Sequence, residues 1–259
     1  MTVKSKYKYL NKVKFMEFAH RGASVNETEN SVEAFSRAYK MGFKNFELDV
    51  HSSLDEEVFV FHDDNLRRLA GKDFYFGRLS KDTVKSLLID GNKKIPTLLE
   101  IIKKFPDAQL NIDAKSWKVA MPLCRIIEKT KAQERICIGG FNDFRTLKIV
   151  RRLGPKVCYS FGPLGVAWFF IFYFLNLTRN FSAGCLQLPE KLLGFRLISK
   201  SLVKFAHKCG VKVHVWTVND ESIMKGLIDL GVDGIMTDNC AGLKNVLMGR
   251  ELWRQRTKY

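Results

Sequence analysis

The 259-residue sequence predicts a (βα)8 TIM barrel, in which eight parallel strands alternate with eight helices. Short apolar segments of strand length recur between residues 15 and 237, and amphipathic segments of helical length separate them. No linker rich in Pro, Gly or Ser interrupts this alternation, and the chain length suits one large domain. We therefore expect a single α/β domain with its functional side chains at the carboxyl ends of the strands.

The expected elements follow one another along the chain. The predicted strands are 15–20, 46–50, 109–113, 135–138, 156–160, 184–188, 211–218 and 234–237. The predicted helices are 31–41, 117–130, 142–153, 197–209 and 220–230. One apolar segment, 58–62, follows Asp49 after only about eight residues, which is too short for a crossover to a parallel neighbour. We expect it to be the return arm of a β-hairpin inserted after strand two, turning near Asp55 and Glu56 and bringing His62 roughly opposite Asp49.

The two ends of the chain are basic. Residues 1–14 form a lysine-rich stub, residues 15–250 the barrel domain and residues 251–259 a basic tail. No apolar segment of a secretory signal follows the stub, so we do not expect secretion. The six cysteines contain no CxxC pair, which argues against a disulfide scaffold and a zinc site and favours a reducing, intracellular compartment.

The charge balance predicts an anionic partner. The chain carries 43 Lys and Arg residues against 27 Asp and Glu residues, a formal net charge of +16. No helix-turn-helix, RNA-recognition or zinc-finger pattern is present, so we expect no nucleic acid. A phosphorylated substrate and an anionic membrane surface account for the charge equally well, and we expect a cytoplasmic or membrane-associated protein, for instance at the endoplasmic reticulum.

Polar side chains gather where the predicted strands end. His20 and Arg21 close strand one, and the hairpin brings His62. Glu47 and Asp49 stand two residues apart on strand two, so both point to the same face. Further polar groups at strand ends are Asp113, Lys115 and Trp216.

A divalent cation explains the grouped carboxylates. Glu47 and Asp49 repel one another unless positive charge lies between them, and Asp113 on the next strand offers a third ligand. Oxygen ligands without cysteine suit Mg²⁺ or Ca²⁺. The alternative is a structural cluster in which Arg21 and Lys115 pair with the same carboxylates.

The remaining groups suit cleavage of a phosphodiester. His20 and His62 can act as general acid and base, because imidazole titrates near neutral pH. Arg21 and Lys115 supply positive charge for a phosphate. Trp216 is expected to form a wall against the organic substituent of the phosphate, with barrel packing as the alternative.

Several motifs, in order, resemble the glycerophosphodiester phosphodiesterase family from residue 19 to about 247. They are His20-Arg21-Gly22, Glu29-Asn30-Ser31, Glu47-x-Asp49, His62-Asp63, Pro96-Thr97-Leu98, Asn111-Ile112-Asp113-x-Lys115, Trp216-Thr217-Val218-Asn219 and the segment 231–238. The resemblance implies a TIM barrel of the phospholipase C-like phosphodiesterase type. It also implies His20 and His62 in catalysis and Glu47, Asp49 and Asp113 around one divalent ion, Mg²⁺ or Ca²⁺.

The segment 111–115 looks like the membrane-linked lysophospholipase D branch, although the family usually has Glu at the position of Asp113. That branch typically has a membrane helix before the first strand, where this chain has a basic stub, so we expect a shortened or peripheral member. The implied reaction is metal-dependent hydrolysis of a lysophospholipid such as lysophosphatidylcholine to lysophosphatidic acid and the head-group alcohol, by water or by the substrate's own 2-hydroxyl. Alternatives are hydrolysis of water-soluble glycerophosphocholine or glycerophosphoinositol, a phosphoinositide-cleaving phospholipase C, and an inactive membrane-binding barrel.

The segment 162–180 contains an uncharged aromatic stretch. Its apolar core, 166–175, is about 15 Å long as a helix, half of a bilayer core of about 30 Å, so it does not span a membrane. We expect a lip beside the cavity that enters the membrane interface and guides an acyl chain. The alternative is a helix packed on the barrel wall.

The other histidines carry no predicted role. His51 is expected to be solvated on the hairpin, His207 lies on a predicted helix, and His214 is expected to be a hydrogen-bonded core residue.

Overall fold

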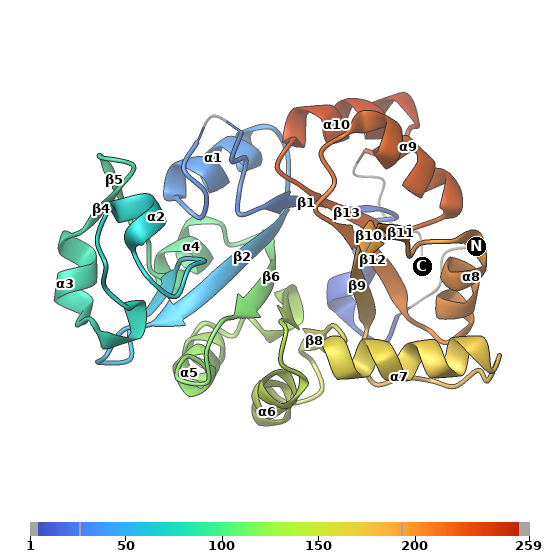
Figure 1. Ribbon diagram of the computed structural model, residues 1–259, viewed down its shortest axis with the longest axis horizontal. Helices are drawn as coiled ribbons and strands as arrows, with labels where there is room; N and C mark the ends of the chain where they lie inside the picture. Colours follow the sequence, from blue (N-terminus) through green and yellow to red (C-terminus); the bar gives the residue numbers. More distant parts are fainter. Residues whose placement is uncertain (1–4, 26, 193, 254–259) are drawn as a thin grey trace.

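Eight parallel strands follow one another around a nearly closed barrel in the computed structural model, which describes residues 5–25, 27–192 and 194–253 (Figure 1). Their order in the sheet is β8-β7-β6-β2-β1-β13-β12-β9, so neighbours in the chain are neighbours around the barrel. Their bounds are Met16–His20 (β1), Asn45–Ser52 (β2), Gln109–Ala114 (β6), Ile136–Gly139 (β7), Cys158–Tyr159 (β8), Cys185–Pro189 (β9), Lys212–Trp216 (β12) and Gly234–Thr237 (β13). The predicted barrel and all eight strand positions are confirmed.

The barrel closes weakly between β8 and β9. Strand β8 has two residues, and an isolated parallel bridge between Ser160 and Cys185 joins the two ends of the sheet. Two backbone hydrogen bonds cross this seam: the N–H of Gly184 donates to the carbonyl of Tyr159 (2.9 Å), and the N–H of Phe161 donates to the carbonyl of Cys185 (3.1 Å). The β2–β6 pair, by contrast, holds six residues in register.

Each barrel strand is followed, within the described residues, by a helix of the outer ring. The bounds are Val32–Lys40 (α1), Leu98–Lys104 (α4), Ala120–Thr130 (α5), Asp143–Leu153 (α6), Pro163–Phe174 (α7), Lys200–Lys208 (α8), Glu221–Leu230 (α9) and Cys240–Gly249 (α10). Side chains such as those of Ser31, Asn142 and Asp220 accept hydrogen bonds from the first turns and fix the starts of their helices. The five predicted helices are confirmed, whereas α4 and α10 had not been predicted.

The two missed helices have weak signals in the sequence. Helix α4 has only seven residues, and the capping box of Thr97 and Glu100 marks its start. Helix α10 contains two helix-disfavouring glycines, Gly242 and Gly249, and is less amphipathic than α1 or α6.

The predicted hairpin is confirmed. Strand β3 (Val58–Val60) runs antiparallel to β2, with Val50 opposite Val60 and the left-handed residue Glu56 (φ 67°) in the turn. An outlying segment follows, visible at the left end of Figure 1. It contains α2 (Arg67–Ala70), a 3-10 turn at Phe76–Arg78, α3 (Lys81–Ser86), β4 (Leu88–Ile89) and β5 (Lys93–Lys94), and it encloses a small second core.

The N-terminal segment belongs to the barrel. Between its lysines, Tyr7, Tyr9 and Leu10 are buried, and a 3-10 turn at Lys8–Asn11 lies against the amino-terminal end of the strands, where the Gln109 amide donates to the Tyr9 carbonyl. The barrel therefore begins before the predicted boundary at residue 15. At the other end, Trp253 packs on Phe43 (ring centroids 5.2 Å apart), and the rest of the predicted tail, 254–259, lies outside the described residues.

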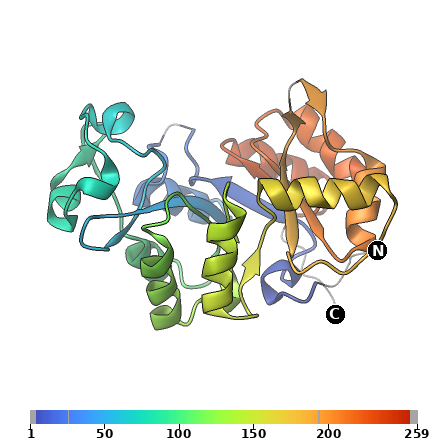
Figure 2. The same cartoon turned by 60° about the horizontal axis from the view of Figure 1, so that its bottom comes forward.

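Two features lie beside the second half of the barrel. Figure 2 shows α7, in yellow, running along the outside, and above it a small hairpin of β10 (Lys191–Leu192) and β11 (Phe195–Arg196). Among the described residues, no helix is both long enough and apolar enough to cross a membrane.

Candidate active site

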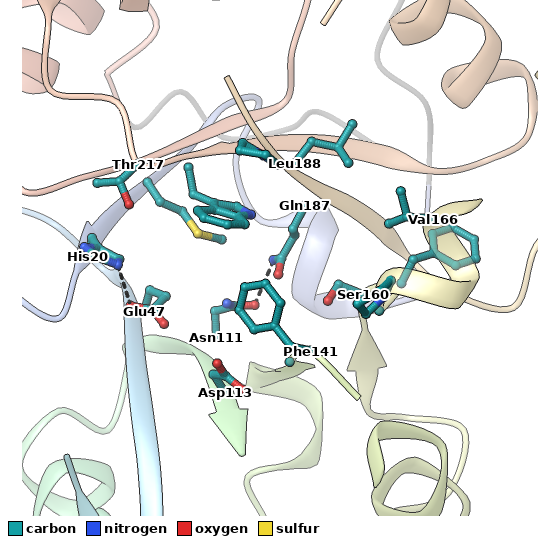
Figure 3. A pocket seen from close by; sticks show the side chains of 18 of the residues that line it. His20, Glu47, Asn111, Asp113, Phe141, Ser160, Val166, Gln187, Leu188 and Thr217 are labelled. Carbon is teal, nitrogen blue, oxygen red and sulfur yellow. Dashed lines mark hydrogen bonds and ion pairs between the residues drawn. The ribbon is translucent and has the colours of Figure 1, made fainter. Parts of the chain in front are cut away.

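A cavity of about 780 Å³ opens at the carboxyl ends of the barrel strands. Figure 3 shows that side chains from opposite sides of the barrel point into it. All eight residues predicted from the sequence line this cavity: His20, Arg21, Glu47, Asp49, His62, Asp113, Lys115 and Trp216. The structure thus brings together residues from β1, β2, β6 and β12 and from the end of the hairpin.

His20 stands at the end of β1 between two carboxylates. Its Nδ1 lies 2.7 Å from Oδ1 of Asp238, and its Nε2 lies 3.7 Å from Oε2 of Glu47. Burial opposes protonation of His20, but the charges of Glu47 and Asp238 prevail and raise its pKa. Asp238 itself is partly buried, and hydrogen bonds from His20 and Asn219 lower its pKa to about 2. The carboxylate of Asp238 therefore holds the His20 ring in one orientation.

His62 reaches the cavity from the arm of the hairpin. Its Nδ1 lies 2.7 Å from Oδ1 of Asp63, and Arg68 donates to both oxygens of the same carboxylate. The Nε2–H of His51 donates to the carbonyl of His62 at 3.2 Å. His51 is buried against Phe76, so the expectation that it is solvated was wrong. The small second core of the outlying segment thus fixes the backbone that carries His62.

The three predicted metal ligands lie on neighbouring strands, but cations stand among them. Asp49 is paired with Nε of Arg21 (3.1 Å) and with Nζ of Lys115 (3.1 Å). The same ammonium lies 3.1 Å from Asp113. Glu47, Asp49 and Asp113 are not among the groups of described residues whose ligand atoms come within 4.8 Å of one another. Arg21 and Lys115 thus pair with these carboxylates, which is the arrangement that the sequence analysis gave as the alternative to a metal site.

The donor set nevertheless fits a hard divalent cation. Burial, with the charge of Asp49 next in importance, raises the pKa of Glu47 to about 8. Asp113 has a buried Oδ1 that accepts no hydrogen bond. A nearby cation would bind the unpaired oxygen of Asp113 and would favour the ionised form of Glu47. Ligands that are all oxygen atoms suit Mg²⁺ or Ca²⁺. The residues that can hold such an ion are Glu47, Asp49 and Asp113.

The other side of the cavity is apolar. Helix α7 contributes Val166, Ala167, Phe170 and Phe174 to its lining. Phe174 is 77% exposed at the rim. Leucines of the neighbouring segments, Leu188, Leu192 and Leu197, continue this wall.

Helix α7 packs on the barrel with one side and exposes apolar side chains on another. Phe169 is fully buried against Phe161, Phe181 and Phe205, so this side of the helix packs on the barrel. Four apolar side chains of the helix and its end point outward and are about half or more exposed: Leu164, Trp168, Ile171 and Leu175. At the mouth of the cavity, Trp216 meets the exposed ring of Phe141 edge to face, with centroids 5.8 Å apart.

A second, polar cavity of about 510 Å³ adjoins the first. His20 and Arg21 line both. Its other walls include the acidic residues Glu27, Glu29, Asp90 and Asp238, together with Arg68 and Asn219.

The sequence reasoning assigned no role to several residues of the site. Asp63 and Asp238 each hold a histidine, and Asn30 donates to Asp49 at 3.0 Å. Two features of the sequence could have indicated these roles. Asp63 directly follows His62. Asp238 follows the last barrel strand, which in a closed barrel lies beside the first strand, where His20 stands. On the floor of the cavity, the Gln187 amide donates to Asn111 at 2.9 Å, and no pattern in the sequence indicated this pair (Figure 3).

The fold and the comparison with protein families together define the class of this enzyme, a phosphoric diester hydrolase built on a TIM barrel. The Glycerophosphoryl diester phosphodiesterase family matches residues 20–241, and the chain belongs to this family. The resemblance seen in the motifs is thereby confirmed.

Named relatives agree with this assignment. The chain is 33% identical to "Probable glycerophosphodiester phosphodiesterase 2" of Mycobacterium tuberculosis over 91% of each chain. It is 26% identical to human "Lysophospholipase D GDPD1", covering 94% of this chain and 88% of that protein.

Solved structures share the fold. A glycerophosphodiester phosphodiesterase from Parabacteroides distasonis has a TM-score of 0.72 at 26% identity, covering 93% of this chain and all of that one. A phosphodiesterase from Oleispira antarctica, solved with the product sn-glycerol-3-phosphate, has a TM-score of 0.76 at 24% identity, covering 90% of this chain and 96% of that one.

Proposed function

We propose that this glycerophosphodiester phosphodiesterase is a divalent-metal-dependent lysophospholipase D that works at a membrane surface. The observation that carries the proposal is one cavity with two unlike sides. Histidines, cations and carboxylates line one side, and the aromatic helix α7 lines the other. A lysophospholipid has the same division, a phosphodiester joined to a single acyl chain.

The polar side chains have distinct roles in the proposed reaction. His20 and His62 act as acid and base, because the Nδ1 of each is held by a carboxylate and Nε2 remains to exchange a proton. One takes a proton from the attacking hydroxyl, and the other gives a proton to the departing alcohol. Arg21 and Lys115 bind the phosphate oxygens and stabilise the charge that develops there.

Glu47, Asp49 and Asp113 are the residues that would hold the metal ion. When bound, Mg²⁺ or Ca²⁺ polarises the phosphoryl group as a Lewis acid. Arg21 and Lys115 both pair with Asp49 in this structure. With Asp49 bound to the ion, these two cations would bind the phosphate of the substrate instead. Removal of divalent ions with a chelator is therefore expected to abolish turnover, and Mg²⁺ or Ca²⁺ to restore it.

The lipid part of the proposal rests on α7. Phe170 and Phe174 line the cavity, while Trp168, Ile171 and Leu175 present apolar surface next to its rim. Apolar groups at a rim can enter the interfacial region of a bilayer. The net charge of +16 favours an anionic leaflet.

The decisive experiment measures choline release from lysophosphatidylcholine and from glycerophosphocholine in parallel. Each substrate is tested with Mg²⁺, with Ca²⁺ and with chelator, and His20→Ala serves as the blank. Preference for the lysophospholipid supports the proposal. Preference for the water-soluble diester, the activity in the names of the bacterial relatives, assigns the enzyme to that substrate instead. No release from either substrate by a folded chain leaves a diester with another head group or the inactive barrel.

The lip is tested with the double variant Phe170→Ser/Phe174→Ser. Burying one large apolar side chain is worth about 1.5–3 kcal/mol, so the ratio of lysophospholipid to glycerophosphocholine kcat/KM is expected to fall at least about tenfold. Co-sedimentation with vesicles containing phosphatidylserine is expected to weaken as well. The matched control is Phe74→Ser, an equally aromatic, half-exposed residue of the outlying segment. An unchanged ratio and unchanged vesicle binding would reject the lip.

A further inference from the structure

Three cysteines far apart in the sequence meet inside the barrel. Cys137 of β7, Cys158 of β8 and Cys185 of β9 have their Sγ atoms within 4.8 Å of one another, and the Sγ atoms of Cys137 and Cys185 are 3.8 Å apart. All three are fully buried free thiols. The missing CxxC pair had argued against a zinc site, but spacing along the chain does not reveal ligands that come from three neighbouring strands.

The cluster lies directly beneath the floor of the candidate active site. Gly139, Ser160 and Gln187 line the cavity, and each cysteine precedes one of them by two residues, on the same strand for Gly139 and Gln187 and just past the end of β8 for Ser160. Side chains two residues apart on a strand share a face, so the thiols form the next layer of the barrel interior. At Gly184 a Cβ atom would come within 2.8 Å of Sγ of Cys158, which shows how closely the chain is fitted around the cluster.

Two buried polar atoms near these thiols have no hydrogen-bond partner. The imidazole of His214 lies against the thiol of Cys185, is fully buried, and its Nε2 has no partner. The side-chain amide nitrogen of Gln187 lies 3.5 Å from the other ring nitrogen, Nδ1. The hydroxyl of Tyr9, near the same thiols, is also buried without a partner. Such groups carry a free-energy cost unless a ligand satisfies them.

The spacing of the sulfur atoms suits one ion. Four ligands in a tetrahedron around Zn²⁺, with Zn–S bonds of about 2.3 Å, place neighbouring sulfur atoms about 3.8 Å apart. The observed separation of Cys137 and Cys185 is also 3.8 Å. Three thiolates and one imidazole form a set of ligands found in structural zinc sites.

The position of the cluster suggests what an ion would do there. Cys158 and Cys185 stand on β8 and β9, the two strands that only an isolated bridge joins. A zinc ion bound by Cys137, Cys158 and Cys185 would tie three strands together across this seam.

We propose that Cys137, Cys158 and Cys185 bind one structural Zn²⁺ ion that links β8 and β9, and that His214, which lies against the Cys185 thiol but outside the group of atoms within 4.8 Å of one another, turns toward the ion to supply the fourth ligand. The site is separate from the divalent ion of the active site, whose ligands are oxygen atoms. Binding displaces the protons of the three thiols and involves no oxidation.

The test uses the full chain produced in medium supplemented with zinc or with cobalt. The zinc preparation is expected to contain one zinc ion per chain after dialysis against chelator, measured by elemental analysis. The cobalt preparation is expected to show a thiolate-to-cobalt charge-transfer band, which oxygen ligands of the active site cannot produce. Cys158→Ser and the more conservative Cys158→Ala are expected to lose both signals. The matched control is Cys124→Ser, which removes a buried thiol of α5 outside the cluster and is expected to keep both.

A second readout is thermal stability. A strong chelator present during unfolding is expected to lower the Tm of the wild-type chain to that of Cys158→Ala and to leave the variant unchanged. The proposal is overturned if the wild-type chain is zinc-free as purified and gives no thiolate band with cobalt. It is also overturned if mass spectrometry finds a disulfide between two of the three cysteines.

Discussion

The carboxylates of Asp238 and Asp63 each hold one of the two site histidines, His20 and His62, in a fixed orientation. Asp238 accepts from three groups, namely His20, Ser24 and Asn219, and so fixes which nitrogen of the His20 ring faces the cavity. A ring that is free to rotate or to change tautomer spends less time in the reactive arrangement. Asp238 is therefore a positioning residue in the proposed mechanism.

Asp238→Asn tests this role. We expect kcat to fall about 100-fold, because the support of a general acid or base is commonly worth that much, with KM changed little. Steady-state kinetics on the preferred diester measures both constants. Asp229→Asn removes an exposed carboxylate paired with Arg250 and is the control. Equal loss in both variants, or a rise in KM without loss of kcat, would contradict the positioning role.

A contact between helices α6 and α7 positions the apolar side of the site. Asp143, the first residue of α6, accepts hydrogen bonds from the backbone N–H groups of Gly162, Leu164 and Gly165 at 2.9–3.1 Å. These groups lie at the start of α7, where N–H groups have no partner within the helix. One carboxylate thus caps the neighbouring helix and sets the angle at which α7 passes the cavity.

Asp143→Ala removes this cap. The free energy of unfolding is expected to fall by about 1–2 kcal/mol, the usual cost of losing an N-terminal cap, and KM for a lysophospholipid to rise because Phe170 is less well placed. Urea titration and steady-state kinetics give the two values. Asp82→Ala, an exposed acidic residue in the first turn of α3, is expected to change neither. An Asp143→Ala variant as stable as the wild type would show that the cap contributes nothing.

A buried ion cluster on the amino-terminal side of the barrel contributes to the stability of the whole molecule. Asp233 lies 2.9 Å from Nζ of Lys212 and 2.7 Å from Nε2 of His207, and it accepts from the backbone of Val213. Burial opposes its ionisation, but these partners prevail and lower the pKa of Asp233. A carboxyl group with a lowered pKa stabilises the folded state above its ordinary pKa of about 3.9 and loses this effect as the pH falls below it.

Asp233→Asn leaves Lys212 buried without its counter-charge. We expect a loss of about 3–5 kcal/mol at pH 7, the usual result of breaking a buried pair. The difference in Tm between wild type and variant is expected to shrink below about pH 4, where the wild-type carboxyl also becomes protonated. Thermal unfolding from pH 3 to pH 7 measures it, and a difference that stays constant over this range would contradict the assignment.

The positions of several site residues could be predicted from the order of the chain. His20, Glu47 and Asp49 were expected to lie together, as they do in the cavity, because a barrel exposes the ends of its strands and because side chains alternate along a strand. Val58–Val60 was recognised as a hairpin arm because the connection is too short for a crossover. The same reasoning did not assign a role to Asp238, which serves a residue 218 positions earlier in the chain.

The contacts that the sequence did not reveal depend on packing in three dimensions. The lysine-rich N-terminal stub was predicted to lie outside the barrel domain, yet Tyr9 and Leu10 bury their side chains in the barrel. The pairing of Lys115 with both Asp49 and Asp113 depends on side-chain rotamers, which residue types alone do not specify. The proximity of Cys137, Cys158 and Cys185 depends on the register of three strands.

The two adjoining cavities affect how products depart. His20 and Arg21 line both cavities, so under the proposed function a phosphodiester bound at these side chains would place one substituent toward the apolar opening and the other toward the acidic one. After cleavage, each product would then have its own exit to solvent. Neither has to wait for the other, and inhibition by the two products is expected to follow a random rather than an ordered pattern of release.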